Sequence, residues 1–306
     1  MTRVFFVLTL MLTCWSVDAQ SLRKAMDGYF DMVRSGKSTR IPSDILQAKK
    51  TEEVLALLPA YAADTMPVVR AQAYGVAKAV GLEAASTSLR QKAVRLLVAG
   101  CRDAHKGNVG MAIRALTEFD RSSYSDDAKD SLVSLFHRKP AHIDKYMLLL
   151  GYLELTTVRN DLREIAQQKD YARKDRWAAL LALARMGDSF ATNDILRRVQ
   201  KLPVTDDVVY EIFPDLIYTR QQAVLNVLLD ALKSDARNCA SADAEQDTRI
   251  PCGYRIMEQL APAIQDYPLK LDASGDIQTT DYGVALQTAR DWFAKHPDYK
   301  ILKDRY

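Results

Sequence analysis

Cysteine and histidine are scarce in this chain of 306 residues, with four of each. Neither type recurs at the short, regular spacing that a zinc site needs, so no metal ion is expected. No apolar run reaches the roughly 20 residues that a helix needs to cross a bilayer. The net charge of +3 is too small to indicate a nucleic-acid partner.

Motifs that mark catalytic or nucleotide-binding sites are also missing. The chain has no Gly-x-Ser-x-Gly, no Walker loop, no Gly-x-Gly-x-x-Gly and no His-Glu-x-x-His. Hydrolysis of a glycoside would need two carboxylates facing one cleft. The candidate acids are Glu211, Asp215, Glu258 and Asp266. Acids spaced along helices are more typical of a solvated face, so we expect no enzymatic activity and no cofactor.

The first 19 residues have the pattern of a secretory signal peptide. Arg3 supplies a positive charge, Val4–Thr13 is an apolar core, and Val17–Ala19 ends with small residues suited to cleavage. We therefore predict export to the periplasm or the exterior. A buried N-terminal helix is the alternative. Lipid anchoring at Cys14 is not expected, because bulky Trp15 follows it and the preceding residues match a lipobox poorly.

Three cysteines remain after the predicted cleavage. Cys239 and Cys252 bracket a polar stretch with little helical character, and in an oxidising compartment they are expected to form a disulfide that closes a surface loop. Two free thiols are the alternative. Cys101 follows an apolar run and is expected to be a buried free thiol.

Two segments of the chain, residues 64–81 and 170–187, share one pattern. In each, an acid lies six residues before an arginine (Arg70 or Arg176), small or apolar residues follow at three and seven, and a glycine closes at eleven. The offset of 106 residues is three units of about 35, which is the period of a helical-pair solenoid. Each unit of such an array buries its apolar face only by stacking on its neighbours. The sequence therefore predicts an all-α superhelix of antiparallel helix pairs.

No sustained alternation predicts strands, and helical periodicity extends over the chain. After the signal peptide (residues 1–19), we expect an N-terminal helix and linker at 20–44, a repeat array at 45–220 and a modified helical cap with the disulfide loop at 221–306. The expected helix pairs of the array are 52–63 with 68–80, 89–101 with 109–119, 128–137 with 143–155, 158–168 with 176–186, and 194–202 with 207–217. In the cap, one helix is expected at 255–264.

The pattern Asp-x5-Arg followed by Ala-x3-Ala/Leu-x3-Gly resembles the second helix of HEAT-type repeats, including the PBS-lyase HEAT-like form. The match is good in the two segments above and partial elsewhere, where Gly110 and Lys145 stand at the arginine position. In that family, Asp and Arg form a ladder between adjacent units, and partners lie along the concave surface of the second helices. The resemblance implies structural roles for Asp64, Arg70, Asp170 and Arg176.

A helical wheel separates two faces of the second helices. With Arg70 at position zero, the face expected to be buried carries Val69, Ala73, Val76, Ala77 and Val80. The opposite positions are apolar in the third and fourth units, where they are Tyr146, Leu150, Leu153, Trp177 and Leu181. An exposed apolar patch of this kind usually marks a binding site. Tighter curvature, or a segment such as residues 20–42 folded across the groove, would bury these side chains instead.

We therefore expect an exported, non-enzymatic protein that binds a protein or an extended peptide on the concave face of its second helices. One alternative is a secreted carbohydrate-active enzyme or glycan-binding protein on an α/α scaffold, with tyrosine and tryptophan as sugar platforms. Another is a structural subunit of an envelope complex, in which the apolar row is an oligomer interface.

Overall fold

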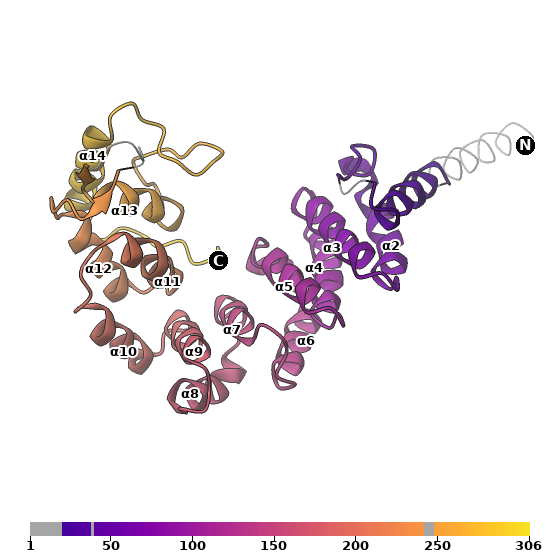
Figure 1. The fold of residues 1–306 in the computed structure, drawn as a ribbon, viewed down its shortest axis with the longest axis horizontal. Helices are drawn as coiled ribbons and strands as arrows, with labels where there is room; N and C mark the ends of the chain where they lie inside the picture. Colours follow the sequence, from indigo (N-terminus) through magenta and orange to yellow (C-terminus); the bar gives the residue numbers. More distant parts are fainter. Residues whose placement is uncertain (1–19, 38–39, 242–247) are drawn as a thin grey trace, which may run out of the picture. The chain divides into compact units, whose positions relative to one another are not determined.

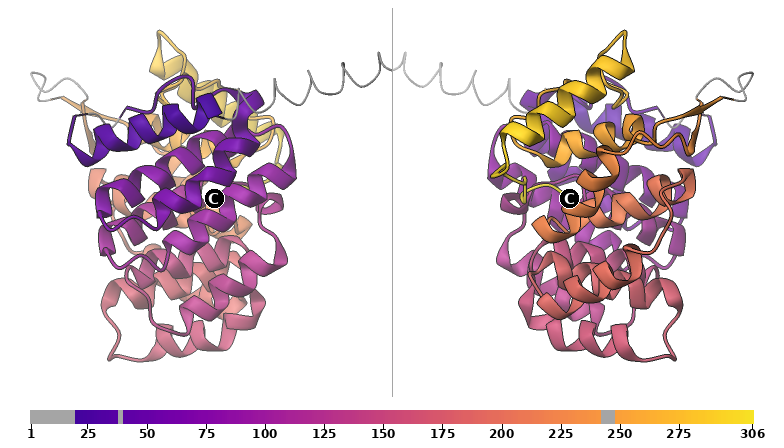
Figure 2. Two further views of the ribbon diagram at one scale, coloured as in Figure 1. Left: turned by 90° about the vertical axis from the view of Figure 1, so that its right-hand side faces the viewer. Right: turned by 90° about the vertical axis from the view of Figure 1, so that its left-hand side faces the viewer.

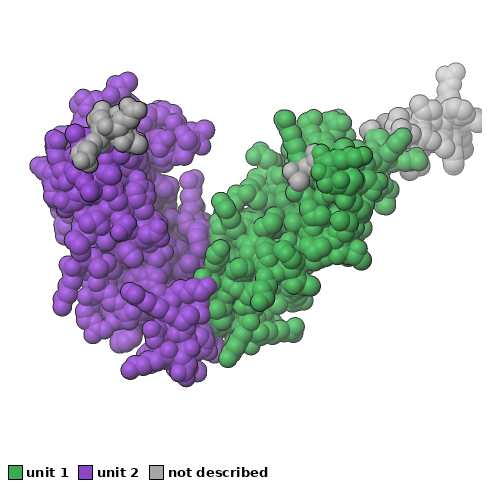
Figure 3. Space-filling model, viewed as in Figure 1, with its two compact units in different colours: residues 1–146 green, residues 147–306 purple. Residues whose placement is uncertain are grey.

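The computed structural model describes residues 20–37, 40–241 and 248–306 (Figure 1). This part of the chain is almost entirely helical, with helices that pack in sequential pairs. The all-α prediction is thereby confirmed. Contacts divide the chain into two compact units, Met1–Tyr146 and Met147–Tyr306 (Figure 3). The predicted signal peptide and Cys14 lie outside the described residues.

Unit 1 begins with a helix at residues 20–34. Its next helices are α2 (Thr51–Ala62), α3 (Pro67–Leu82), α4 (Thr87–Gly100), α5 (Lys106–Leu116) and α6 (Asp126–Phe136), and α7 (Ile143–Tyr152) begins in this unit. Each of α2 to α4 packs on the helix that follows it, and α2 also packs on α4, α3 on α5 and α4 on α6. Helices two apart along the chain are thus neighbours, as a repeat array requires.

Local sequence explains where these helices start and which face they bury. Pro67 occupies the first turn of α3, where its missing N–H costs no hydrogen bond. The side chains of Ser86 and Ser125 accept hydrogen bonds from the first turns of α4 and α6. The wheel prediction for α3 is confirmed, because all five residues of its predicted buried face are at most 2% exposed: Val69, Ala73, Val76, Ala77 and Val80.

Unit 2 continues the pattern of helices that contact their second neighbours. Its elements are α8 (Arg159–Gln167), α9 (Arg173–Arg185), α10 (Ser189–Val199), a π-helical turn (Val208–Ile212), α11 (Phe213–Tyr218), α12 (Gln222–Leu232), α13 (Gly253–Leu260) and α14 (Tyr282–Lys295). Helix α9 packs on α8, α10 and α11, and α12 packs on α10, α11 and α13. Figure 2 shows the same succession of helices from two further sides.

Two predicted helices of unit 2 are divided in the structure, and each contains a proline at the division. The helix predicted at 207–217 is a π-helical turn followed by α11, with Pro214 in the first turn of α11. The helix predicted at 255–264 is α13 followed by a 3-10 turn, Ala261–Ala263, that contains Pro262. Proline has no N–H to donate and its ring crowds the preceding turn, so a regular α-helix does not run through these positions.

The glycines that close the two matching segments serve different purposes. Gly81 lies against α4, and a Cβ there would be 2.4 Å from the Cβ of Ala93. Gly187 has a φ of +82° and ends α9. The N–H of Gly187 donates to Ala184 and the N–H of Asp188 donates to Leu183, which is the hydrogen-bond pattern of a Schellman motif. The same position of the pattern thus allows close helix packing at Gly81 and a positive φ at Gly187.

The cysteine predictions are confirmed. Cys239 and Cys252 form a disulfide, with their Cα atoms 5.1 Å apart, and Cys101 is a buried free thiol. Two short strands that were not predicted, β1 (Cys239–Ala240) and β2 (Arg249–Ile250), pair antiparallel within the disulfide loop. In the described part of the chain, no helix has both the length and the apolar character needed to cross a membrane.

Candidate functional site

The structure corrects the expected exposure of the apolar row on the second helices. Tyr146 in unit 1, and Leu150, Leu153 and Leu181 in unit 2, are 0, 0, 6 and 1% exposed, respectively. Only Trp177 remains partly accessible. A wheel built from one helix identifies the face opposite to one neighbour, but these helices are covered on more than one side. The row is therefore part of the core, and only Trp177 is available to contact a partner directly.

Close helix packing accounts for part of this burial. Gly151 of α7 approaches α9 so closely that a Cβ there would be 2.6 Å from the Cα of Ala182. Tyr218 of α11 extends to α7, where its hydroxyl donates to the carbonyl of Leu148 at 2.6 Å. The part of α7 that belongs to unit 2 thus lies in one layer with α9 and α11.

A segment from the other end of unit 2, residues 300–306, lies against this layer. It is first held beside η5, the turn at Ala261–Ala263, in an antiparallel bridge between Ile264 and Ile301. The N–H of Gln265 donates to Lys300 at 2.9 Å, and the N–H of Leu302 donates to Ala263 at 2.8 Å. The trace then ends beside α11 (Figure 1). The sequence suggested residues 20–42 as a segment that could cover the apolar row, whereas the segment found against these helices is 300–306.

Arg185, at the end of α9, is the centre of the contacts with this segment. It is 3% exposed, and its Nη2 donates to the carbonyls of Lys303, at 3.0 Å, and of Arg305. Its Nη1 donates to the carbonyl of Tyr218. The guanidinium carbon lies 5.6 Å from the ring centroid of Tyr152 and 5.3 Å from that of Tyr218, close enough for cation–π attraction.

Arg220 supplies the second guanidinium and is 4% exposed. Its Nη2 donates to the main-chain oxygen of Tyr306 at 3.0 Å and its Nη1 to Ile217 at 3.2 Å. It forms no ion pair with any residue that the structure describes. Burial, and then the neighbouring charge of Arg185, lower the pKa of Arg220 to about 10. Both buried guanidiniums therefore donate to main-chain oxygens of residues 303–306.

Tyr306 fills the space between two aromatic side chains of the layer. Its ring centroid lies 5.6 Å from that of Tyr152 and 5.3 Å from that of Tyr218, and both pairs are inclined. Burial raises the pKa of the Tyr306 phenol, and the nearby Asp215 carboxylate raises it further. The Tyr152 hydroxyl donates to the carbonyl of Asp304 at 2.7 Å. We call Tyr152, Arg185, Tyr218 and Arg220 the seat of segment 303–306.

Trp177 borders this region through a contact between α9 and α11. Its indole Nε1 donates to Oδ2 of Asp215 at 2.6 Å. Burial raises the pKa of Asp215; the hydrogen bond from Trp177 acts against this, and the charge of Glu211 adds to it. Asp215 is thus tied to the one residue of the predicted row that stays accessible.

The other candidate acids of a carbohydrate site lie on different elements. Glu258 of α13 accepts a hydrogen bond from the Tyr282 hydroxyl at 2.9 Å. Asp266 borders an open surface hollow together with Trp292 and His296. Within the described ranges, no three residues of the His, Cys, Asp and Glu types come together as a metal site would need.

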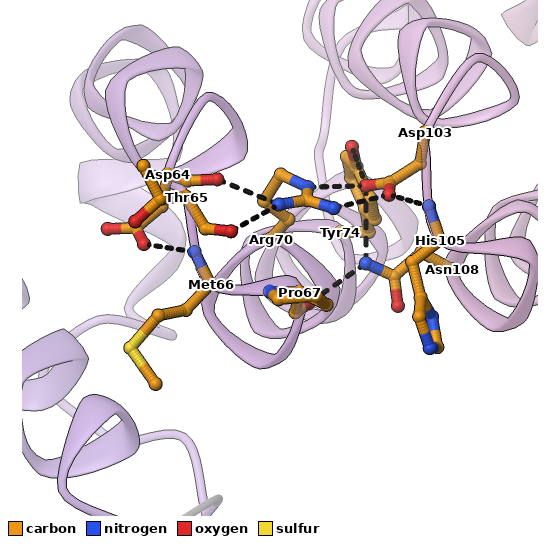
Figure 4. A network of polar contacts seen from close by, with 9 residues as sticks. All are labelled: Asp64, Thr65, Met66, Pro67, Arg70, Tyr74, Asp103, His105 and Asn108. Carbon is orange, nitrogen blue, oxygen red and sulfur yellow. Dashed lines mark hydrogen bonds and ion pairs between the residues drawn. The ribbon is translucent and has the colours of Figure 1, made fainter.

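A polar network in unit 1 joins α3 to the start of α5 (Figure 4). The Asp103 carboxylate is fully buried and accepts hydrogen bonds from Nε and Nη2 of Arg70, at 2.8 and 2.7 Å. Tyr74, Asn108 and the N–H of His105 donate to it as well. Burial acts to raise the pKa of Asp103, but these hydrogen bonds, led by Arg70, outweigh it and hold the pKa below its usual value.

The resemblance implied a ladder of contacts for four residues, and only the two in unit 1 form contacts of this kind. Arg70 joins Asp103 and also donates to the carbonyl of Asp64, while the Asp64 carboxylate accepts from Arg34 at 2.7 Å. Both residues of the first segment thus connect neighbouring helix pairs. Asp170 and Arg176 have no side-chain hydrogen bond or ion pair with any described residue. The shared spacing therefore does not produce the same contacts in both copies.

The seat was not predicted from the sequence, although one signal was present. Arg185 is the only charged residue in the run from Trp177 to Met186, and an isolated charge in an apolar helix often has a buried partner. Nothing local indicates that the partner lies 118 residues away. Comparisons with protein-family models, curated proteins and solved structures found no match to this chain. The structure shows a mostly helical protein whose helices pack in pairs that follow one another along the chain.

Proposed function

We propose that this chain is an exported, non-enzymatic α-solenoid protein of the HEAT-like kind, which binds an extended peptide segment of a protein partner on the second-helix layer of unit 2. The repeat pattern at residues 64–81 and 170–187 supports the solenoid assignment. So do the contacts between second-neighbour helices inside each unit, such as α3 with α5 and α9 with α11.

One observation carries the binding proposal: a stretch of polypeptide already lies on the second helices and is held there through its main chain. Arg185 and Arg220 donate to its carbonyls from buried positions. An arginine guanidinium is planar and carries several donors in a fixed geometry, which suits it to fixed acceptors. Recognition of an extended peptide commonly combines main-chain hydrogen bonds with a pocket for one side chain. The seat has both.

Export is supported by the disulfide between Cys239 and Cys252, because such bonds persist mainly in oxidising compartments. The signal pattern of residues 1–19 agrees with this, and periplasmic or extracellular location is the expectation that follows.

A photo-crosslinking amino acid at position 177 tests the binding site. Trp177 is partly accessible and borders the layer, so the probe replaces a side chain that is not part of the core. The matched control places the same probe at Phe190, an aromatic side chain of α10 that is 57% exposed. We expect irradiation of the exported protein to crosslink a partner segment at 177 and not at 190. Equal recovery of partner from both positions, or none from 177, would contradict the proposal.

A further inference from the structure

The hydrogen bonds from the seat to residues 303–306 are made to main-chain oxygens, which every residue carries. Tyr152 donates to the main-chain oxygen of Asp304. Arg185 donates to those of Lys303 and Arg305, and Arg220 donates to that of Tyr306. The side chains of residues 303–305 are exposed. The seat therefore recognises the main chain of a segment that is neither helix nor strand and that bends at Asp304, and a different segment in the same conformation would satisfy the same donors.

Tyr306 is the exception, because its ring enters the layer. It lies between Tyr152 and Tyr218, with centroid separations of 5.6 and 5.3 Å. Aromatic rings in inclined contact add to the gain from burying apolar surface. A segment that replaced this one would need an aromatic side chain at the same place to fill the gap.

The seat also needs an occupant. Arg185 and Arg220 are 3 and 4% exposed, respectively. Their positive charges repel each other, and the charge of Arg185 lowers the pKa of Arg220. These low exposures apply with residues 303–306 in place. If the segment left, both guanidiniums would lose the oxygen atoms to which they donate, and water or another segment would have to replace them. Arg220 also has a φ of +51°, a conformation that a non-glycine residue rarely adopts and that is often found at functional sites. Exchange of one chain segment for another keeps these donors satisfied.

We propose that residues 303–306 are an internal occupant of the seat, which competes with the partner, and that the partner is an extended peptide with a tyrosine or phenylalanine at the place of Tyr306. This inference rests on the proposed function. An attached segment acts at a high effective concentration, commonly in the millimolar range for short linkers. The apparent affinity for a partner is then reduced by the fraction of molecules in which the seat is already filled.

A labelled peptide with the sequence of residues 300–306, Lys-Ile-Leu-Lys-Asp-Arg-Tyr, provides the test. Its binding to the full chain is followed by fluorescence polarisation. The change Tyr306→Ala in the protein weakens the internal occupant and leaves the seat intact. We expect the variant to bind the peptide at least about tenfold more tightly than the parent, because the free fraction of the seat rises. Tyr306→Phe keeps the ring and should bind like the parent.

Two controls show that the peptide occupies the seat. A peptide ending in alanine should bind at least about tenfold more weakly to the Tyr306→Ala protein, since aromatic side chains dominate such contacts. Adding Arg185→Lys to that protein should also weaken binding, because lysine lacks the planar set of donors. The matched variant is Arg290→Lys: Arg290 also binds main-chain carbonyls, those of Leu232 and Ser234, but lies outside the seat, and its replacement should leave peptide affinity unchanged.

The outcomes separate this inference from the proposed function. If parent and Tyr306→Ala bind the peptide equally, the competition is refuted while the seat remains a peptide site. If the alanine-ended peptide binds as well as the tyrosine-ended one, the aromatic requirement is refuted. If neither protein binds either peptide and circular dichroism shows both folded, the seat accepts no added segment, and the binding site of the proposed function is refuted too.

Discussion

Replacing Asp103 by alanine should lower the unfolding free energy of unit 1. The loss should be larger than that caused by removing any surface ion pair of the same unit. Asp103 is fully buried, and Arg70, its partner at 2.7 Å, is 13% exposed. Tyr74, Asn108 and the N–H of His105 also donate to the same carboxylate. The substitution removes one member of a buried ion pair and leaves its donors without an acceptor.

Removing one partner of a buried ion pair typically costs about 3–5 kcal/mol. Arg70 keeps two acceptors, the carbonyls of Asp64 and Thr65, at 2.8 and 3.1 Å, and it retains some contact with water. We therefore expect a value at the lower end, about 3 kcal/mol for Asp103→Ala. The control is Glu118→Ala. Glu118 pairs with Lys78 at 2.6 Å, and the two side chains are 39 and 37% exposed, respectively. Such surface pairs contribute about 0–1 kcal/mol.

Urea unfolding followed by circular dichroism measures the loss, and amide hydrogen exchange in α3 and α5 locates it. The local measurement is needed because a chain with two compact units does not have to unfold in one step. Faster exchange in α3 and α5 of Asp103→Ala, with little change in unit 2, is the expected result. A midpoint shift no larger than that of Glu118→Ala would refute the reasoning.

The difference in unfolding free energy between the parent and Asp103→Ala should also depend on pH. The folded-state pKa of Asp103 lies below the ordinary value of 3.8, so its contribution is complete above that value and is lost as pH falls through the folded-state pKa. The difference in unfolding free energy between parent and Asp103→Ala should be constant from about pH 7 to 5 and should narrow below about pH 4. A difference that stays constant to pH 2.5, or that grows on acidification, would contradict this assignment.

Three further predictions concern other parts of the chain. Cys239→Ser with Cys252→Ser should lower the unfolding free energy by about 3 kcal/mol in the chain-entropy model; an unchanged urea midpoint would contradict it. Cys101 is buried and its thiol pKa is raised to about 12, so maleimide at neutral pH should label it only after denaturation, and rapid labelling of the folded protein would be inconsistent with that burial. Gly151→Ala should destabilise unit 2 by at least about 1–3 kcal/mol, because the new Cβ meets the main chain of Ala182 and the crowding exceeds the gain in helix propensity; a thermal melt that moves upward would show that the helices separate easily.

The helices themselves could be predicted because the signals that form them are local. An apolar face repeats every three to four residues, and the face predicted for α3 from Val69 to Val80 is the one that is buried. The least accurate boundaries involve Pro214 and Pro262, where a continuous helix was expected and two shorter elements form. The disulfide between Cys239 and Cys252 was also predictable, since an oxidising compartment favours pairing of two cysteines on either side of a short polar loop.

The candidate site depends on contacts that no local pattern contains. Tyr146, Leu150, Leu153 and Leu181 are apolar in the sequence whether they line a groove or lie inside a core, and their neighbours decide which. The equal spacing of Asp and Arg in two segments did not produce equal contacts, because the acid that pairs with Arg70 is Asp103, from the next helix pair.

By itself, the sequence determined the helices and their packing in sequential pairs, the buried stripe of α3 and the disulfide, because each depends on residues close together along the chain. Tertiary structure alone decided that Arg185 and Arg220 bind residues 303–306, across separations of up to 120 positions. The physical reason is that a buried guanidinium needs acceptors, and main-chain carbonyls, which every residue carries, become its partners only where folding brings them within reach.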